Sequence, residues 1–61
     1  MTSSIAVWYT DLLTGVESSE TIRLRELHFF FEDEALGLIR VDEVHQSFDD
    51  WETMEVIYKA S

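Results

Sequence analysis

The sequence predicts an α+β fold, in which a small antiparallel sheet of three to four strands carries one short acidic helix on a face. Two strand-like segments precede an acidic middle with helical periodicity, and a further strand-like segment follows it. The chain has 61 residues, of which 46% are hydrophobic and 13% aromatic, so it is too apolar for a disordered acidic tail. We therefore expect residues 1–61 to form a single small domain.

The N-terminal half predicts two strands joined by a turn. Residues Ile5–Thr10 are β-branched and aromatic, as is typical of a strand. Residues 11–19 contain a glycine and two serines, which indicate a turn. A second strand is expected to begin near Glu20, because Ile22 and Leu24 alternate with arginines.

The apolar pattern changes after this second strand. Leu27, Phe29 and Phe31 occupy odd positions, whereas the preceding apolar residues occupy even ones. We interpret the change near Glu26 as a bulge or as the end of the strand. The last strand is clearer, because apolar residues alternate with other residues along 53–59.

The middle of the chain permits more than one interpretation. Its apolar residues form two helical faces that point in nearly opposite directions, so one straight helix would be apolar on both sides. Either two short helices meet near Arg40, or residues 36–41 form a strand and about 42–52 form the helix. The alternative fold is a small all-β barrel with 35–46 as one long strand. That barrel would need polar and apolar residues on the same strand face.

No catalytic constellation is recognisable, so we predict a protein that is not an enzyme and uses no metal or cofactor. The chain has no cysteine for a disulfide or a zinc–thiolate site. His28 and His45 stand apart, and no glycine-rich phosphate loop is present. A signal peptide and a membrane-spanning run are also not recognisable, so we expect a cytoplasmic protein.

Charge is the most informative property of the sequence. Thirteen acidic residues against four Lys and Arg residues give a net charge of −9. This charge disfavours direct binding to nucleic acid or to anionic membranes and favours a partner protein with a basic surface. Residues 31–61 alone hold nine acidic and two basic side chains, a net charge of −7, so the acidic surface is expected from the second half.

Carboxylates two residues apart on a strand or four apart on a helix lie roughly 6–7 Å from each other, a spacing similar to that of neighbouring phosphates. The acidic surface is therefore predicted to fill a basic nucleic-acid groove of a host enzyme as a DNA mimic. The candidate partner-binding residues are Glu32, Asp33, Glu34, Asp42, Glu43, Asp49, Asp50 and Glu52, with Phe30 and Trp51 as apolar anchors.

Aromatic residues are too numerous for one face of a small sheet. The run His28–Phe31 leaves some rings exposed or buried against another chain, a partner or a second copy in a homodimer. The competing interpretation places Phe29 and Phe31 in the core and Phe30 under the loop at 11–19. The alternative function is a non-catalytic accessory subunit or a homodimeric structural module whose acidity provides only solubility.

Two short segments resemble a known family. Val16–Glu20, followed by Asp33–Leu36, is similar to the small inhibitor of bacterial RNA polymerase made by T7-like bacteriophages, and the resemblance covers residues 16–40. It implies a strand–strand–helix–strand fold and a phage protein that blocks a host enzyme by binding it. The last strand in that family bears arginine, whereas Glu55 and Lys59 occupy this region here, so its binding residues do not transfer. A CRISPR effector is an equally suitable basic target.

Overall fold

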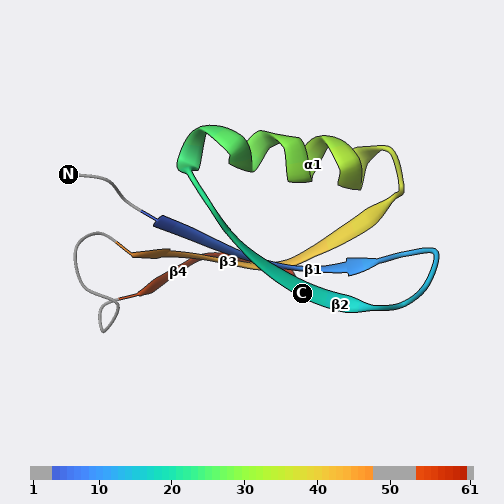
Figure 1. Ribbon diagram of the computed structural model, residues 1–61, viewed down its shortest axis with the longest axis horizontal. Coiled ribbons are helices and arrows are strands. Elements are labelled where there is room, and N and C mark those ends of the chain that lie inside the picture. Colours follow the sequence, from blue (N-terminus) through green and yellow to red (C-terminus); the bar gives the residue numbers. More distant parts are fainter. Residues whose placement is uncertain (1–3, 48–53, 61) are drawn as a thin grey trace.

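A computed structural model describes residues 4–47 and 54–60 of the chain. It contains a four-stranded antiparallel sheet of order β2-β1-β3-β4, with one helix lying across a single face (Figure 1). The α+β prediction is therefore confirmed. The elements in chain order are β1 (Ser4–Asp11), β2 (Glu17–Ile22), the 3-10 turn η1 (Leu24–Glu26), α1 (Leu27–Ala35), β3 (Ile39–Ser47) and β4 (Glu55–Lys59).

The β1–β2 hairpin begins the fold, and its turn is built by Asp11. One carboxylate oxygen of Asp11 accepts hydrogen bonds from the backbone N–H groups of Leu13 at 2.8 Å and Thr14 at 3.1 Å. Gly15 follows with a φ of +77°, a left-handed conformation that glycine adopts without steric cost. The turn lies within the predicted segment 11–19, although β2 already begins at Glu17.

The helix lies earlier in the chain than we expected. The parity change near Glu26 marks the end of a strand, because β2 stops at Ile22 and η1 and α1 follow. The three-residue and one-residue spacing of Leu27, Phe30 and Phe31 places these side chains on one side of α1, where they pack against the core. An apolar run of this length is compatible with a strand or a helix, and only packing onto the sheet decides between them.

The prediction of a helix over 42–52 is wrong for residues 42–47, which belong to β3. The cause is a β-bulge, because Trp8 pairs with Glu43 and Tyr9 pairs with Val41, which leaves Asp42 as an extra residue. The bulge lets Val41 and Val44 both be fully buried, and their three-residue spacing resembles a helical one. The all-β alternative is wrong because residues 27–35 form α1. The long strand that it predicted is partly present as β3, where the bulge at Asp42 changes which residues face the core.

The helix ends at a glycine. The N–H of Leu38 donates to the carbonyl of Asp33 at 3.0 Å, and the N–H of Gly37 donates to the carbonyl of Glu34 at 3.0 Å. Gly37 has a φ of +78°, so these bonds form the glycine-terminated helix end known as the Schellman motif. Gly37 therefore turns the chain from α1 directly into β3.

The core lies between the sheet and α1. Ile5, Val7, Ile39, Val41 and Val44 are buried. Their packing neighbours, which are only partly buried, are Tyr9, Ile22, Leu27, Phe30 and Phe31. The helix α1 covers one face of the sheet, and no helix among residues 4–47 and 54–60 covers the opposite face, which we call the open face. No helix among the described residues is long and apolar enough to cross a membrane.

The final strand β4 lies within the segment predicted for it. It pairs antiparallel with β3, with Glu43 opposite Lys59 and Val44 opposite Tyr58. All five residues of β4 are exposed. The helix reaches this strand through Phe31, whose ring meets that of Tyr58 edge to face at a centroid distance of 5.2 Å.

Candidate protein-binding surface

Three consecutive acidic residues lie in the last turns of α1. Glu32 and Asp33 are exposed, whereas Glu34 is half-buried. The carbonyl end of a helix carries partial negative charge, so carboxylates are disfavoured there. The last turn of α1 holds no basic residue that would offset them.

Glu34 has a structural role that accounts for its position. Its Oε2 atom accepts a hydrogen bond of 2.8 Å from the backbone N–H of Val41. Val41 lies beside the bulge of β3 and is fully buried, so the carboxylate satisfies a donor that would otherwise be costly to bury. Glu34 therefore links the end of α1 to β3 and is not a free binding residue.

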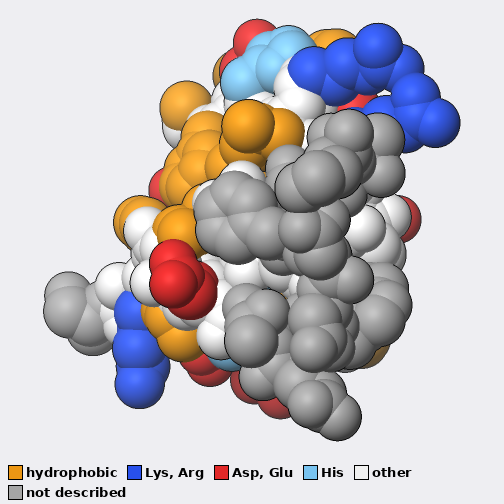
Figure 2. Space-filling model, turned by 90° about the vertical axis from the view of Figure 1, so that its left-hand side faces the viewer, with side chains coloured by type: hydrophobic (Ala, Val, Ile, Leu, Met, Phe, Trp, Pro, Cys, Tyr) orange, Lys and Arg blue, Asp and Glu red, His pale blue; other side chains and the backbone are white. Residues whose placement is uncertain are grey.

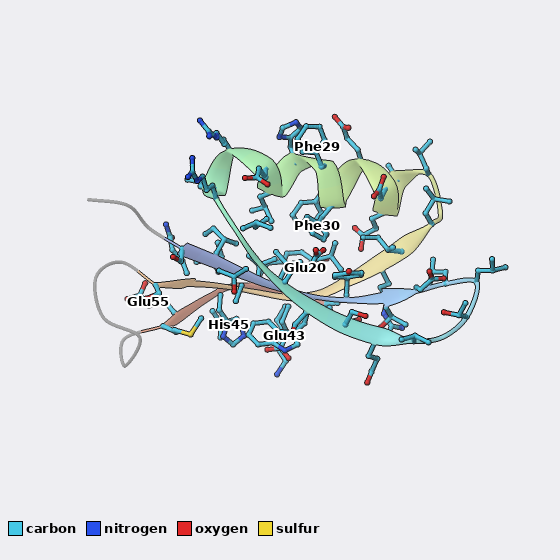
Figure 3. The ribbon with its side chains drawn as sticks, viewed as in Figure 1. Glu20, Phe29, Phe30, Glu43, His45 and Glu55 are labelled. Carbon is cyan, nitrogen blue, oxygen red and sulfur yellow. The ribbon has the colours of Figure 1, made fainter. Side chains whose placement is uncertain are left out.

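Asp33 lines a groove between α1 and the sheet, with a volume of about 200 Å³. We call this the α1 groove; it is lined by Tyr9, Glu20, Phe29, Phe30, Asp33 and Ile39. Two carboxylates, one from β2 and one from α1, thus share one groove, and none of its described lining residues is basic. Figure 3 shows Glu20 and Phe30 between the helix and the sheet, whereas Phe29 points away from the sheet.

The side chains of the α1 groove are held by neighbours. The hydroxyl group of Tyr9 donates a hydrogen bond of 3.1 Å to the carboxylate of Glu20. Burial raises the pKa of Tyr9, and the hydrogen bond and charge of Glu20 raise it further. The ring of Tyr9 also packs on that of Phe30, at a centroid distance of 5.3 Å. The hydrogen bond from Tyr9 on β1 therefore orients the carboxylate of Glu20 on the neighbouring strand β2.

The aromatic run is divided between core and surface. Phe30 and Phe31 are partly buried and pack against the core, so Phe31 faces the core as predicted without being one of its buried residues. Phe29 is 56% exposed, so the prediction that it fills the core is wrong. Phe30 packs on Tyr9 instead of under the loop at 11–19. Helical geometry explains the difference, because Phe29 is turned away from the face that Phe30 and Phe31 share.

The other two described candidates, Asp42 and Glu43, belong to the open face of the sheet. Asp42 accepts hydrogen bonds from the hydroxyl group of Thr10 at 2.6 Å and from Nε of Arg40 at 2.7 Å. These interactions, that of Thr10 first, lower the pKa of Asp42 although burial opposes the shift. The hydrogen bond to Asp42 and the negative charge of that carboxylate raise the pKa of Arg40. The negative charge of Asp42 is therefore largely compensated within the molecule.

Glu43 also has a partner on this face. Its Oε1 atom lies 3.0 Å from Nε2 of His45. The ring of His45 lies against that of Trp8, with centroids 4.4 Å apart, and Figure 3 shows His45 and Glu43 on the side away from the helix. A shallow groove of about 410 Å³ crosses this face, lined by Trp8, Tyr9, Glu17, Ser18, Ser19, Arg40, Asp42 and Glu43.

The structure thus separates the predicted site into two parts. Glu32 and Asp33 lie on α1, whereas Asp42 and Glu43 lie on the opposite face of the sheet. The candidates Asp49, Asp50, Trp51 and Glu52 lie outside the described residues. Sequence reasoning missed Glu20, because it became a groove residue only through the pairing of β2 with β1. No group of three or more metal-ligating side chains occurs among residues 4–47 and 54–60.

Comparison with protein families, with characterised proteins and with solved structures finds no match for this chain. The resemblance of residues 16–40 to the phage inhibitor of RNA polymerase therefore stays a prediction.

Proposed function

We propose that the protein is a small acidic inhibitor that binds a basic, nucleic-acid-binding surface of a host enzyme through the α1 groove. Bacterial RNA polymerase and CRISPR effectors have the required surface, and a bacteriophage origin follows from the resemblance described above. Carboxylates set the orientation and the association rate in such a complex, and an exposed aromatic ring adds buried apolar area.

One observation carries the proposal. The α1 groove combines Glu20 and Asp33 with the exposed ring of Phe29, and no basic residue occurs among its described lining residues. The basic residues Arg23 and Arg25 precede α1, at the opposite end of the helix from Asp33. The open-face groove is a weaker candidate, because Arg40 already neutralises Asp42 there.

The position of the acidic residues on α1 supports a role beyond folding. Glu32 and Asp33 each oppose the helix dipole, and within the described part of the chain no side-chain hydrogen bond like that of Glu34 explains them structurally. A local arrangement that weakens stability without a structural gain is typical of a functional surface. A partner with Lys or Arg side chains would relieve this repulsion on binding.

The test is a binding measurement with purified bacterial RNA polymerase and, separately, a purified CRISPR effector complex. We expect binding that weakens as salt is raised and that duplex DNA competes away. The double variant E20Q/D33N should lose on the order of tenfold in affinity, which corresponds to about 1.4 kcal/mol. F29A should weaken binding as well.

The matched control is E17Q/E26Q, which removes the same number of charges outside the α1 groove. It should bind nearly as tightly as the unmodified chain. Equal losses in the two double variants would show that only total charge matters, and the α1 groove would have no specific role. Failure to bind either enzyme class would favour the alternative in which acidity serves solubility.

A further inference from the structure

β4 lies at one edge of the sheet, with β3 as its single strand neighbour among the described residues (Figure 1). Its three central side chains are apolar and exposed: Val56 is 54% exposed, Ile57 45% and Tyr58 36%. The outer side of an edge strand presents unpaired N–H and C=O groups, which can bind a further strand. The strand contains one bulge, because Val56 pairs with His45 and Tyr58 with Val44, which leaves Ile57 as an extra residue. The apolar strand around this bulge is a docking edge for a further strand.

The apolar surface continues from β4 to the helix. The edge-to-face contact of Phe31 with Tyr58 joins the two elements. Figure 2 shows hydrophobic side chains gathered on the end of the molecule from which β4 starts, with basic side chains in separate places. A strand added to β4 would therefore cover apolar side chains as well as complete a backbone ladder.

Charge identifies the occupant. β4 begins with Glu55 and ends with Lys59, so the strand is neutral within a chain of net charge −9. In an antiparallel pair, the beginning of each strand lies beside the end of the other, which brings opposite charges together. We propose that β4 binds β4 of a second copy of this chain, forming a two-fold symmetric dimer with one continuous sheet.

The other edge of the sheet explains why assembly would stop at two chains. β2 is polar along most of its length and carries Glu17 and Glu20 but no basic residue. Pairing of two β2 strands would bring only negative charges to the contact, with no basic side chain of β2 to offset them. Only the β4 edge is self-complementary, so the contact closes as a dimer. The proposal does not depend on the α1 groove, whose lining includes no residue of β4.

Sedimentation equilibrium of the full chain over a wide concentration range tests the dimer. We expect the unmodified chain to dimerise and I57K to be monomeric, with a dissociation constant higher by on the order of tenfold or more. The matched control is L13K, which adds the same charge at a residue that is 93% exposed in the β1–β2 turn. L13K should dimerise like the unmodified chain.

A charge-swap series tests the orientation of the strands. E55K changes the net charge from −9 to −7, so overall repulsion between chains falls. Antiparallel pairing nevertheless predicts weaker dimerisation, because the lysine introduced by E55K would meet Lys59 of the second copy. The double variant E55K/K59E restores opposite charges and should regain much of the affinity. Circular dichroism verifies folding, since position 59 stands opposite Glu43 in its own chain.

Three results would overturn the proposal: a monomer at every concentration, a folded I57K variant that still dimerises, or tighter dimerisation by E55K. Salt separates this interface from the proposed inhibitory site. Salt screens the long-range repulsion between two chains of net charge −9 more strongly than the adjacent Glu55–Lys59 pairs, so it should strengthen the dimer. It should weaken binding of the α1 groove to a basic enzyme. A chain that dimerises but binds no basic enzyme would refute only the proposed function.

Discussion

The hydroxyl group of Thr10 donates a 2.6 Å hydrogen bond to the carboxylate of Asp42, the extra residue in the β3 bulge. Thr10 is itself buried, on the face of the sheet that α1 does not cover. The contact joins β1 to the bulge, the point at which the core-facing residues of β3 change from odd to even numbers. It therefore holds the bulge that allows both Val41 and Val44 to enter the core.

Replacement of Thr10 should raise the pKa of Asp42. T10V removes the hydroxyl donor at nearly constant volume, and the remaining contact with Arg40 compensates only in part. We expect T10V to lower the free energy of unfolding at neutral pH by about 1 kcal/mol, and T10S to lower it less. Carboxyl titration by NMR measures the pKa. An unchanged pKa of Asp42 in T10V would show that this hydrogen bond is not the main cause of the shift.

The same carboxylate predicts a dependence of stability on pH. The pKa of Asp42 in the folded protein lies below its ordinary value of 3.8, so its stabilisation is present above that value. It is lost as the pH falls through the lower, folded-state pKa. D42N lacks this contribution, and the stability difference between D42N and the unmodified chain should shrink toward low pH. Urea unfolding from about pH 7 to about pH 2 measures it.

Glu34 should be more important for stability than its neighbour Glu32. E34A leaves the buried N–H of Val41 without its acceptor, at a cost of about 1–3 kcal/mol. E34Q retains an acceptor oxygen and should cost less. E32A, at an exposed position of the same helix, is the control and should change stability little. Hydrogen exchange of the Val41 amide should accelerate in E34A, and unaltered protection would contradict the assigned role.

The helix dipole predicts opposite effects at the two ends of α1. D33N removes a charge from the C-terminal turn and should stabilise the fold by about 0.3–1 kcal/mol. E26Q removes a charge beside the N-terminus, where Glu26 is the cap residue, and should destabilise by a similar amount. Thermal unfolding at low salt compares the two variants, and high salt should reduce both effects. Changes of the same sign would exclude the dipole as their cause.

D33N also connects stability to the proposed function. The substitution should make the isolated protein more stable while E20Q/D33N weakens its binding to a basic enzyme. Such an exchange of stability for binding is expected where charges are kept for a partner. The stability gain of D33N is measured on the isolated protein, so it can be tested before any partner is identified.

Local patterns in the sequence were sufficient to predict the fold class, the first and last strands and the turn between β1 and β2. Ile5 and Val7 alternate with outward residues, and Gly15 permits a left-handed turn, so both features follow from neighbouring residues. The acidic character also follows from composition alone. These properties depend on neighbouring residues and on overall composition, both of which can be read from a single sequence.

The position of the helix and the composition of the groove were decided by tertiary structure. The apolar run Leu27–Phe31 suits a strand or a helix, and packing against the sheet selected the helix. The bulge at Asp42 gave β3 a three-residue spacing of buried valines that imitates a helix, because an extra residue inverts the faces of a strand. That Glu20 and Asp33 line the same groove depends on the pairing of β2 with β1 and on the packing of α1 against the sheet, so no local pattern encodes it.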